Sequence, residues 1–124
     1  MIHAFKTELG TARESQIREI FSRMGRFERV SNGELEGNGF DLICNSKGKH
    51  WLGEIKIKPV DSPAVDSFNR KCKDVKSVEK KMIFALFGID KKAALLAKDL
   101  GMEVWDLGRI NRERKKYKLS KIRV

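Results

Sequence analysis

The sequence contains few cysteine and histidine residues and no long apolar run. Its two cysteines, Cys44 and Cys72, form no Cys-x-x-Cys pair, and its two histidines, His3 and His50, lack partners at metal-ligand spacing. These shortages argue against a zinc site and favour buried, reduced thiols. No apolar run approaches the roughly 18 residues that a membrane helix needs, and no signal-peptide pattern occurs. We therefore expect a soluble, cytoplasmic protein that does not enter the membrane.

Positive charge is the most abundant feature. The chain has 124 residues, of which 35% are charged and 40% hydrophobic, and its formal net charge is +10. This length suits one domain, covering residues 1–124. A basic surplus attracts polyanions through counterion release. Nucleic acid is the expected partner, because no predicted helix combines a basic face with the broad apolar face that a membrane surface would require. The sequence also lacks Gly-x-x-x-x-Gly-Lys-Ser/Thr, so no nucleotide-binding loop of that kind is predicted.

Residues 39–59 predict a β-hairpin around which the chain is organised. Two apolar-rich strands, 40–45 and 50–58, flank a turn at 46–49, where Gly48 can supply a positive φ. Side chains alternate along a strand, so Glu54, Lys56 and Lys58 should share one face. Asp41 stands at the start of the partner strand.

An acid facing a Glu-x-Lys pair suggests a metal site with an adjacent ammonium. Hydrolysis of a phosphodiester needs a hard cation held by a few oxygens, with open positions for phosphate and water. Two carboxylates and one carbonyl meet that need, and a nearby lysine can stabilise developing charge. The alternative is a solvated strand face with a weak ion pair, which contributes ~0–1 kcal/mol.

A helix over residues 11–24 is predicted ahead of the hairpin. Thr11 is a good N-cap, Gly25 suits the C′ position, and one apolar stripe contains Ile17, Ile20, Phe21 and Met24. Glu14 continues this stripe. It fits two roles equally, as the third residue of a capping box with Thr11 or as a further acid of the metal site.

The remaining pattern predicts a mixed α/β sheet flanked by helices, in the order αβββαβαβ. A strand covers 26–31, a glycine-rich loop 32–38 follows, and a helix begins at Ser62-Pro63 after the hairpin. A buried strand covers 81–87, a helix capped by Asp90 ends at Gly101, and a last strand covers 103–107. The strand–helix–strand unit favours parallel pairing with a right-handed crossover.

Basic residues outside this core are candidate phosphate contacts. Several lie on the outer side or flank of the helix after Pro63, and others lie in the basic tail 109–124. That tail is either a solvated, frayed terminus or an arm that grips a phosphate backbone. The predicted nucleic-acid contacts are Lys58, Asn69, Arg70, Lys71, Lys73, Arg112, Arg114, Lys115 and Lys116.

Three short motifs resemble the PD-(D/E)xK nuclease superfamily, and within it the Mrr-type restriction endonuclease-like and archaeal Holliday junction resolvase branches. They are Ala12-Arg13-Glu14 in the first helix, Gly39-Phe40-Asp41-Leu42-Ile43 on the second strand and Gly53-Glu54-Ile55-Lys56 on the third. Residues 93–106 are similar to the closing helix and strand of the family. Phe40 stands where the named motif has proline.

The resemblance implies a restriction endonuclease-like core and a metal-dependent DNA endonuclease. Asp41, Glu54 and the main-chain carbonyl of Ile55 would bind Mg²⁺ (or Mn²⁺), Lys56 would orient or deprotonate the attacking water, and Glu14 would complete the outer metal shell. We expect a homodimer acting on duplex or branched DNA. A non-catalytic nucleic-acid-binding module that acts with a partner subunit is the alternative. An RNA-processing enzyme ranks lower, because neither histidine has an obvious partner.

Overall fold

In the computed structural model, which describes residues 2–33 and 39–124, helices and strands follow the predicted order αβββαβαβ, with one more helix at the end. The elements are α1 (Ile2–Met24), β1 (Arg29–Ser31), β2 (Leu42–Ser46), β3 (Lys49–Lys56), α2 (Ser62–Lys73), β4 (Val78–Ala85), α3 (Lys91–Asp99), β5 (Glu103–Asp106) and α4 (Leu107–Lys116). The predicted α/β class is confirmed. Residues 34–38 of the predicted loop 32–38 lie outside the described residues.

The strands form a five-stranded mixed sheet in the order β1-β2-β3-β4-β5. β1, β2 and β3 pair antiparallel, whereas β3, β4 and β5 pair parallel. The turn between β2 and β3 uses Lys47 and Gly48, both with positive φ, as a tight two-residue hairpin turn requires. The predicted hairpin and the predicted parallel pairing of the last two strands are therefore confirmed.

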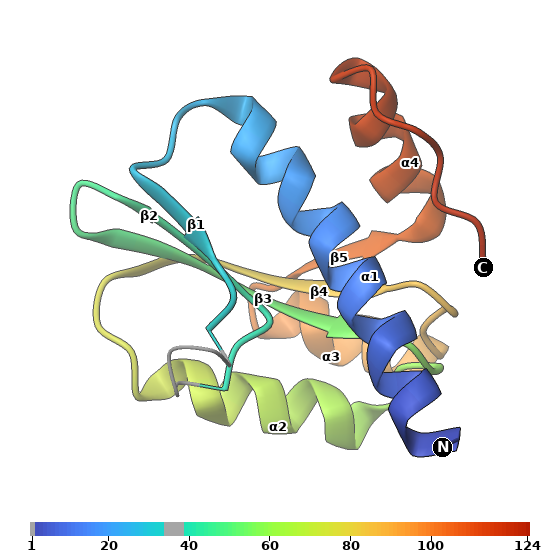
Figure 1. Ribbon diagram of the computed structural model, residues 1–124. Coiled ribbons are helices and arrows are strands. Elements are labelled where there is room, and N and C mark those ends of the chain that lie inside the picture. Colours follow the sequence, from blue (N-terminus) through green and yellow to red (C-terminus); the bar gives the residue numbers. More distant parts are fainter. Residues whose placement is uncertain (1, 34–38) are drawn as a thin grey trace.

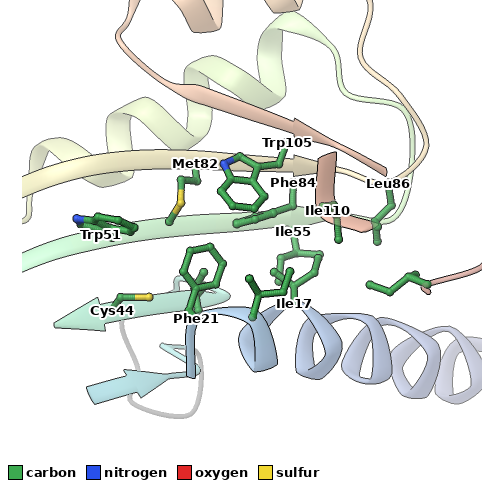
Figure 2. Close-up of a cluster of buried hydrophobic side chains, with 13 residues drawn as sticks. Ile17, Phe21, Cys44, Trp51, Ile55, Met82, Phe84, Leu86, Trp105 and Ile110 are labelled. Carbon is green, nitrogen blue, oxygen red and sulfur yellow. The ribbon is translucent and has the colours of Figure 1, made fainter. Parts of the chain in front are cut away.

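Helices cover both faces of the sheet, and each face carries its own hydrophobic core (Figure 1). α1 and α4 lie over one face, where Phe21 packs among Trp51, Phe84 and Trp105 (Figure 2). α2 and α3 lie over the other face, where Phe68 meets the ring of Phe40. Alternation along β3 sends Ile55 into the first core and leaves Glu54 facing α2.

The first helix is longer than predicted, because it begins at Ile2 rather than at Thr11. Residues 2–10 include several good helix formers and no proline, and Gly10 is tolerated inside the helix at a cost of about 1 kcal/mol. Thr11 is therefore not an N-cap, and the predicted capping box with Glu14 is wrong. The C-terminal prediction is confirmed, since Gly25 has a φ of +68°.

Side-chain caps fix the starts of α2 and α3. Asp90 accepts a hydrogen bond from the Ala93 amide, as predicted, whereas α2 is capped by Asp61 and not by Ser62. Asp and Ser both cap helices well, so the sequence offers two adjacent candidates. The Asp61 carboxylate, rather than the Ser62 hydroxyl, accepts the capping hydrogen bond. The predicted bounds of β3, β4 and β1 shift too: β3 ends at Lys56, β4 covers Val78–Ala85, and β1 is limited to Arg29–Ser31.

The predicted basic tail is folded. Residues 107–116 form α4, and the following segment turns back so that Ile122 is fully buried in the core beneath α1. The side chain of Asn111 holds the Ile122 backbone through both of its polar atoms, at 3.0 and 2.8 Å. A frayed terminus is therefore excluded for this segment. No helix among the described residues has the length and apolar character needed to cross a bilayer.

Candidate active site

Two buried carboxylates lie near the start of β2 and the end of β3, which are neighbouring strands: Asp41 just precedes β2, and Glu54 lies in β3. The β2–β3 register pairs Leu42 with Gly53, and Asp41 and Glu54 are the next residues beyond this pair on the two chain segments. Opposed residues of an antiparallel pair have side chains on the same face, with Cβ atoms roughly 5 Å apart. Asp41 is 4% exposed and Glu54 is 8% exposed. The structure thus brings together the two acids that the sequence singled out.

Asp41 is fixed by the backbone around it. Its Oδ2 accepts a hydrogen bond from the Ile55 amide at 2.8 Å. Its own carbonyl oxygen accepts from an Arg18 guanidinium nitrogen of α1 at 3.4 Å. A carboxylate held by a backbone N–H keeps its orientation, so the second oxygen of Asp41 has a defined direction.

Glu54 has two ammonium groups beside it. Lys71 of α2 lies 2.8 Å from Oε2, and Lys56 of the same strand lies 4.0 Å from Oε1. Both lysines are partly exposed, with 38% and 28% of their side chains accessible, whereas Glu54 is buried. A buried carboxylate requires such partners, because an uncompensated charge in the interior is costly.

The oxygens of Asp41 and Glu54 suit a hard divalent cation. Carboxylate and carbonyl oxygens are what Mg²⁺ prefers, and it normally keeps water in its remaining positions. Across the part of the chain that the structure describes, no three His, Cys, Asp or Glu side chains gather closely enough to bind one ion. Asp41 and Glu54 are the carboxylates of this candidate site, and the metal roles of the Ile55 carbonyl oxygen and of Glu14, a partly buried residue of α1, stay predictions.

A thiol and an amide lie buried on the α2 side of the site. Burial raises the pKa of Cys72 to about 11. Among the nearby charges, Lys81 and Lys71 lower this pKa and Glu54 raises it. Asn69 is 7% exposed, and its side-chain oxygen accepts from Lys81 at 3.1 Å. Asn69 therefore faces inward, and its predicted contact with nucleic acid is wrong. Residue 69 is one helical turn from Val65 and Cys72, which explains its burial.

The other predicted contacts on α2 remain at the surface or in ion pairs. Arg70 is exposed and pairs with Asp66 at 2.6 Å. Lys73 is exposed, and so is Lys58, which lies just beyond the end of β3. Lys71 differs from them, because its ammonium is engaged by Glu54 and by the carbonyl oxygen of Gly39 at 2.9 Å.

α4 presents a second group of basic residues. Arg112 and Lys115 are exposed and line a groove of about 590 Å³, which also involves Lys121 and has Leu107 and Leu119 in its walls. Lys116 is exposed and pairs with a helix neighbour.

Arg114 is the exception on α4, because it is 2% exposed. Its guanidinium donates to main-chain carbonyls of α1 and of the final segment. The predicted phosphate contact of Arg114 is therefore wrong, because this residue lies on the side of α4 that faces the core.

Sequence reasoning missed two side chains that shape the site, Lys71 as the partner of Glu54 and Arg18 as a donor to Asp41. Lys71 immediately precedes buried Cys72, at the flank of the apolar stripe of α2. A lysine there can bury its aliphatic part and direct its ammonium toward a buried acid. That position was the available signal for Lys71, whereas Arg18 had none, because its target is a main-chain oxygen.

Comparisons with models of known families, with curated proteins and with solved structures found no match to this chain. The functional assignment therefore depends on the chain's own residues. Those residues provide a pair of buried acids, two ammonium groups beside Glu54 and two exposed basic surfaces.

Proposed function

We propose that the protein is a metal-dependent endonuclease that hydrolyses phosphodiester bonds of DNA on a restriction endonuclease-like core. The observation that supports the proposal is the contact of the Asp41 carboxylate with the Ile55 amide, next to Glu54, together with the Lys56 ammonium 4.0 Å from Glu54. An acid pair beside a lysine is the set of groups that phosphodiester hydrolysis with a hard cation needs.

Each residue then has a distinct role. Asp41 and Glu54, with the carbonyl oxygen of Ile55, would hold Mg²⁺ or Mn²⁺, which supplies a Lewis acid when bound. The Ile55 amide keeps the Asp41 carboxylate in place. Lys56 is the partly exposed last residue of β3, where its ammonium can orient an attacking water or stabilise charge that develops on the phosphate.

Substrate capture follows from the distribution of charge. The formal net charge is +10, and exposed cations gather on α2 and along the α4 groove. Such surfaces bind a phosphate backbone in a salt-dependent manner and without reading its sequence. Duplex or branched DNA is the proposed substrate, and a homodimer is the proposed assembly.

Cleavage assays with varied metal and DNA form test the proposal. We expect Mg²⁺- or Mn²⁺-dependent cuts in a panel of duplex, four-way-junction and single-stranded DNA. Glu54→Gln and Lys56→Met should each lower the cleavage rate at least about 100-fold. Lys92→Met removes the same charge from an exposed position of α3 that is not a predicted DNA contact, and it should keep cleavage within a few-fold of the parent. Undiminished cleavage by both site variants would refute the assignment.

The ion pair between Lys71 and Glu54 favours a second candidate, a nucleic-acid-binding module without catalysis. In that case the acids are structural, and a lysine satisfies the buried Glu54 permanently. The same assays separate the two candidates: DNA binding with no metal-dependent cleavage in any form supports the binding module.

A further inference from the structure

The ammonium of Lys71 contacts two oxygens of the kind that a divalent cation would use. Its Nζ lies 2.8 Å from Oε2 of Glu54 and 2.9 Å from the carbonyl oxygen of Gly39. Hard cations choose carboxylate and carbonyl oxygens as ligands. Lys71 therefore contacts the side chain that the proposed metal ion would need.

The two partners of this ion pair differ in their freedom to move. The Glu54 side chain is 11% exposed and is fixed on a central strand, whereas the Lys71 side chain is 38% exposed and lies near the end of α2. The Lys71 ammonium also lies 5.6 Å from the centre of the Phe40 ring. A part-exposed lysine can return its ammonium to water at little cost, but Glu54 cannot leave.

A divalent ion and the Lys71 ammonium cannot share Glu54 without strong repulsion. Like charges a few ångströms apart disfavour each other, and the effect grows where water is excluded. Glu54 nevertheless requires a positive partner at all times, because it is buried. An exchange of partners satisfies both conditions.

We infer that Lys71 is an exchangeable counter-ion, which holds the place of a divalent cation on Glu54 and leaves that carboxylate when the cation binds. The inference rests on the proposed metal site. Lys71 thereby neutralises the acid pair when no metal is bound and weakens metal binding by competition, since a ligand that must displace a bound group has a lower apparent affinity.

Titration with Mn²⁺, followed by the electron paramagnetic resonance signal of the free ion, tests the exchange directly. We expect Lys71→Gln and Lys71→Met to bind Mn²⁺ about fivefold more tightly than the parent, because the competing pair is lost. Lys71→Arg keeps the charge and should stay within twofold of the parent. Lys73→Gln, an exposed neighbour on the same helix, controls for the change in net charge.

Glu54→Gln shows whether the Mn²⁺ binds at the proposed metal site, because this variant should lose the Mn²⁺ binding that depends on the Glu54 carboxylate. Uptake that depends on Glu54 but is unchanged or weaker in both neutral Lys71 variants overturns the inference and leaves the proposed function standing. Tighter uptake without DNA cleavage supports the exchange and refutes the nuclease. Absence of any Glu54-dependent uptake refutes both. Thermal unfolding of each variant verifies that it is folded, and the glutamine variant keeps a hydrogen-bonding side chain if the methionine variant fails to fold.

Discussion

The guanidinium of Arg114 donates a hydrogen bond to the main-chain carbonyl of Gln16, a residue 98 positions earlier in the chain. The same group donates to the carbonyl of Ser120 and lies 3.2 Å from a carboxylate oxygen of Glu19. One buried cation thus joins α1, α4 and the final segment. Its place on α4 makes it a structural residue among surface-directed basic neighbours.

Replacement of Arg114 should therefore reduce stability where replacement of Arg112 does not. We expect Arg114→Ala to lower the free energy of unfolding by about 2–4 kcal/mol, because two main-chain carbonyl groups lose the donor that this buried side chain provides. Arg112→Ala, at an exposed position two residues away, should change it by less than about 0.5 kcal/mol. Urea denaturation followed by circular dichroism measures both. Equal losses would show that Arg114 has no special role.

Two substitutions at Asp41 separate the effect of its negative charge from the effect of its hydrogen bond with the Ile55 amide. In Asp41→Asn the side-chain oxygen can still accept from the Ile55 amide, so the stability should change by less than about 1 kcal/mol. Mn²⁺ uptake and DNA cleavage should nevertheless be lost. Asp41→Ala leaves the amide unpaired and should cost about 1–3 kcal/mol as well. Thermal unfolding and metal titration of the two variants check this contrast. Full cleavage by Asp41→Asn would remove Asp41 from the site.

Gly53 is required by close packing next to Glu54. A Cβ at this position would lie 2.9 Å from a ring carbon of Phe84 and 3.0 Å from Cβ of Leu42. We expect Gly53→Ala to destabilise the fold by about 1–3 kcal/mol through overpacking and to reduce cleavage by displacing the strand. Gly108→Ala meets nothing closer than 3.4 Å and serves as the control. Denaturant unfolding that found the two variants equally stable would contradict this expectation.

The ionised Glu103 side chain should stabilise the fold at neutral pH, and this contribution should be lost in acid. Burial raises the pKa of Glu103, but hydrogen bonds from Lys80 and Trp105 and the charges of Lys80 and Arg109 outweigh burial, so its pKa is lowered from the ordinary value of 4.5. A carboxyl whose folded-state pKa is depressed stabilises the fold fully above the unfolded-state value, and this contribution disappears as the pH falls through the folded-state value.

Glu103→Gln should accordingly be less stable than the parent at neutral pH, and the difference should shrink below the ordinary carboxyl pKa of 4.5. Melting temperatures measured from acidic to neutral pH give the difference directly. Glu28→Gln, in the exposed segment before β1, should show a much smaller difference. A difference that grew on acidification would have the wrong sign for this network.

The two thiols should be unreactive in the folded protein. Burial raises the pKa of Cys44 to about 12 and that of Cys72 to about 11. Both are free and buried, as the sequence predicts. Iodoacetamide at about pH 8 should leave the native protein unmodified and label both residues in urea, since the thiolate is the reactive form. Mass spectrometry counts the added groups, and rapid labelling of the native protein would exclude the assigned burial.

Local signals were sufficient where a feature depends on a few neighbouring residues. Gly48 and its polar neighbours predict the hairpin turn, and Asp90 and Gly101 predict both ends of α3. Alternation along the hairpin also placed Glu54 and Lys56 correctly on one side of β3. These features need only backbone preferences and a two-residue period.

Features that depend on distant partners could not be predicted. Gly10 and Thr11 look like a helix start, and only packing of the whole element shows that α1 continues through them. α4 has Ile110 as its one fully apolar core residue, and its other buried side chain is Arg114, which any pattern assigns to the surface. The partnership of Lys71 with Glu54 likewise exists only after α2 packs on the sheet.

Ile122 is buried in the same cluster as Ile17 and Ile20, and this has a consequence for folding during synthesis. α1 is synthesised before the sheet, yet part of its apolar side is covered by a residue that lies more than a hundred positions later in the sequence. The part of the α1 stripe that Ile122 covers therefore stays exposed until residue 122 has been synthesised. Exposed apolar side chains of this kind favour aggregation until the remaining contact forms.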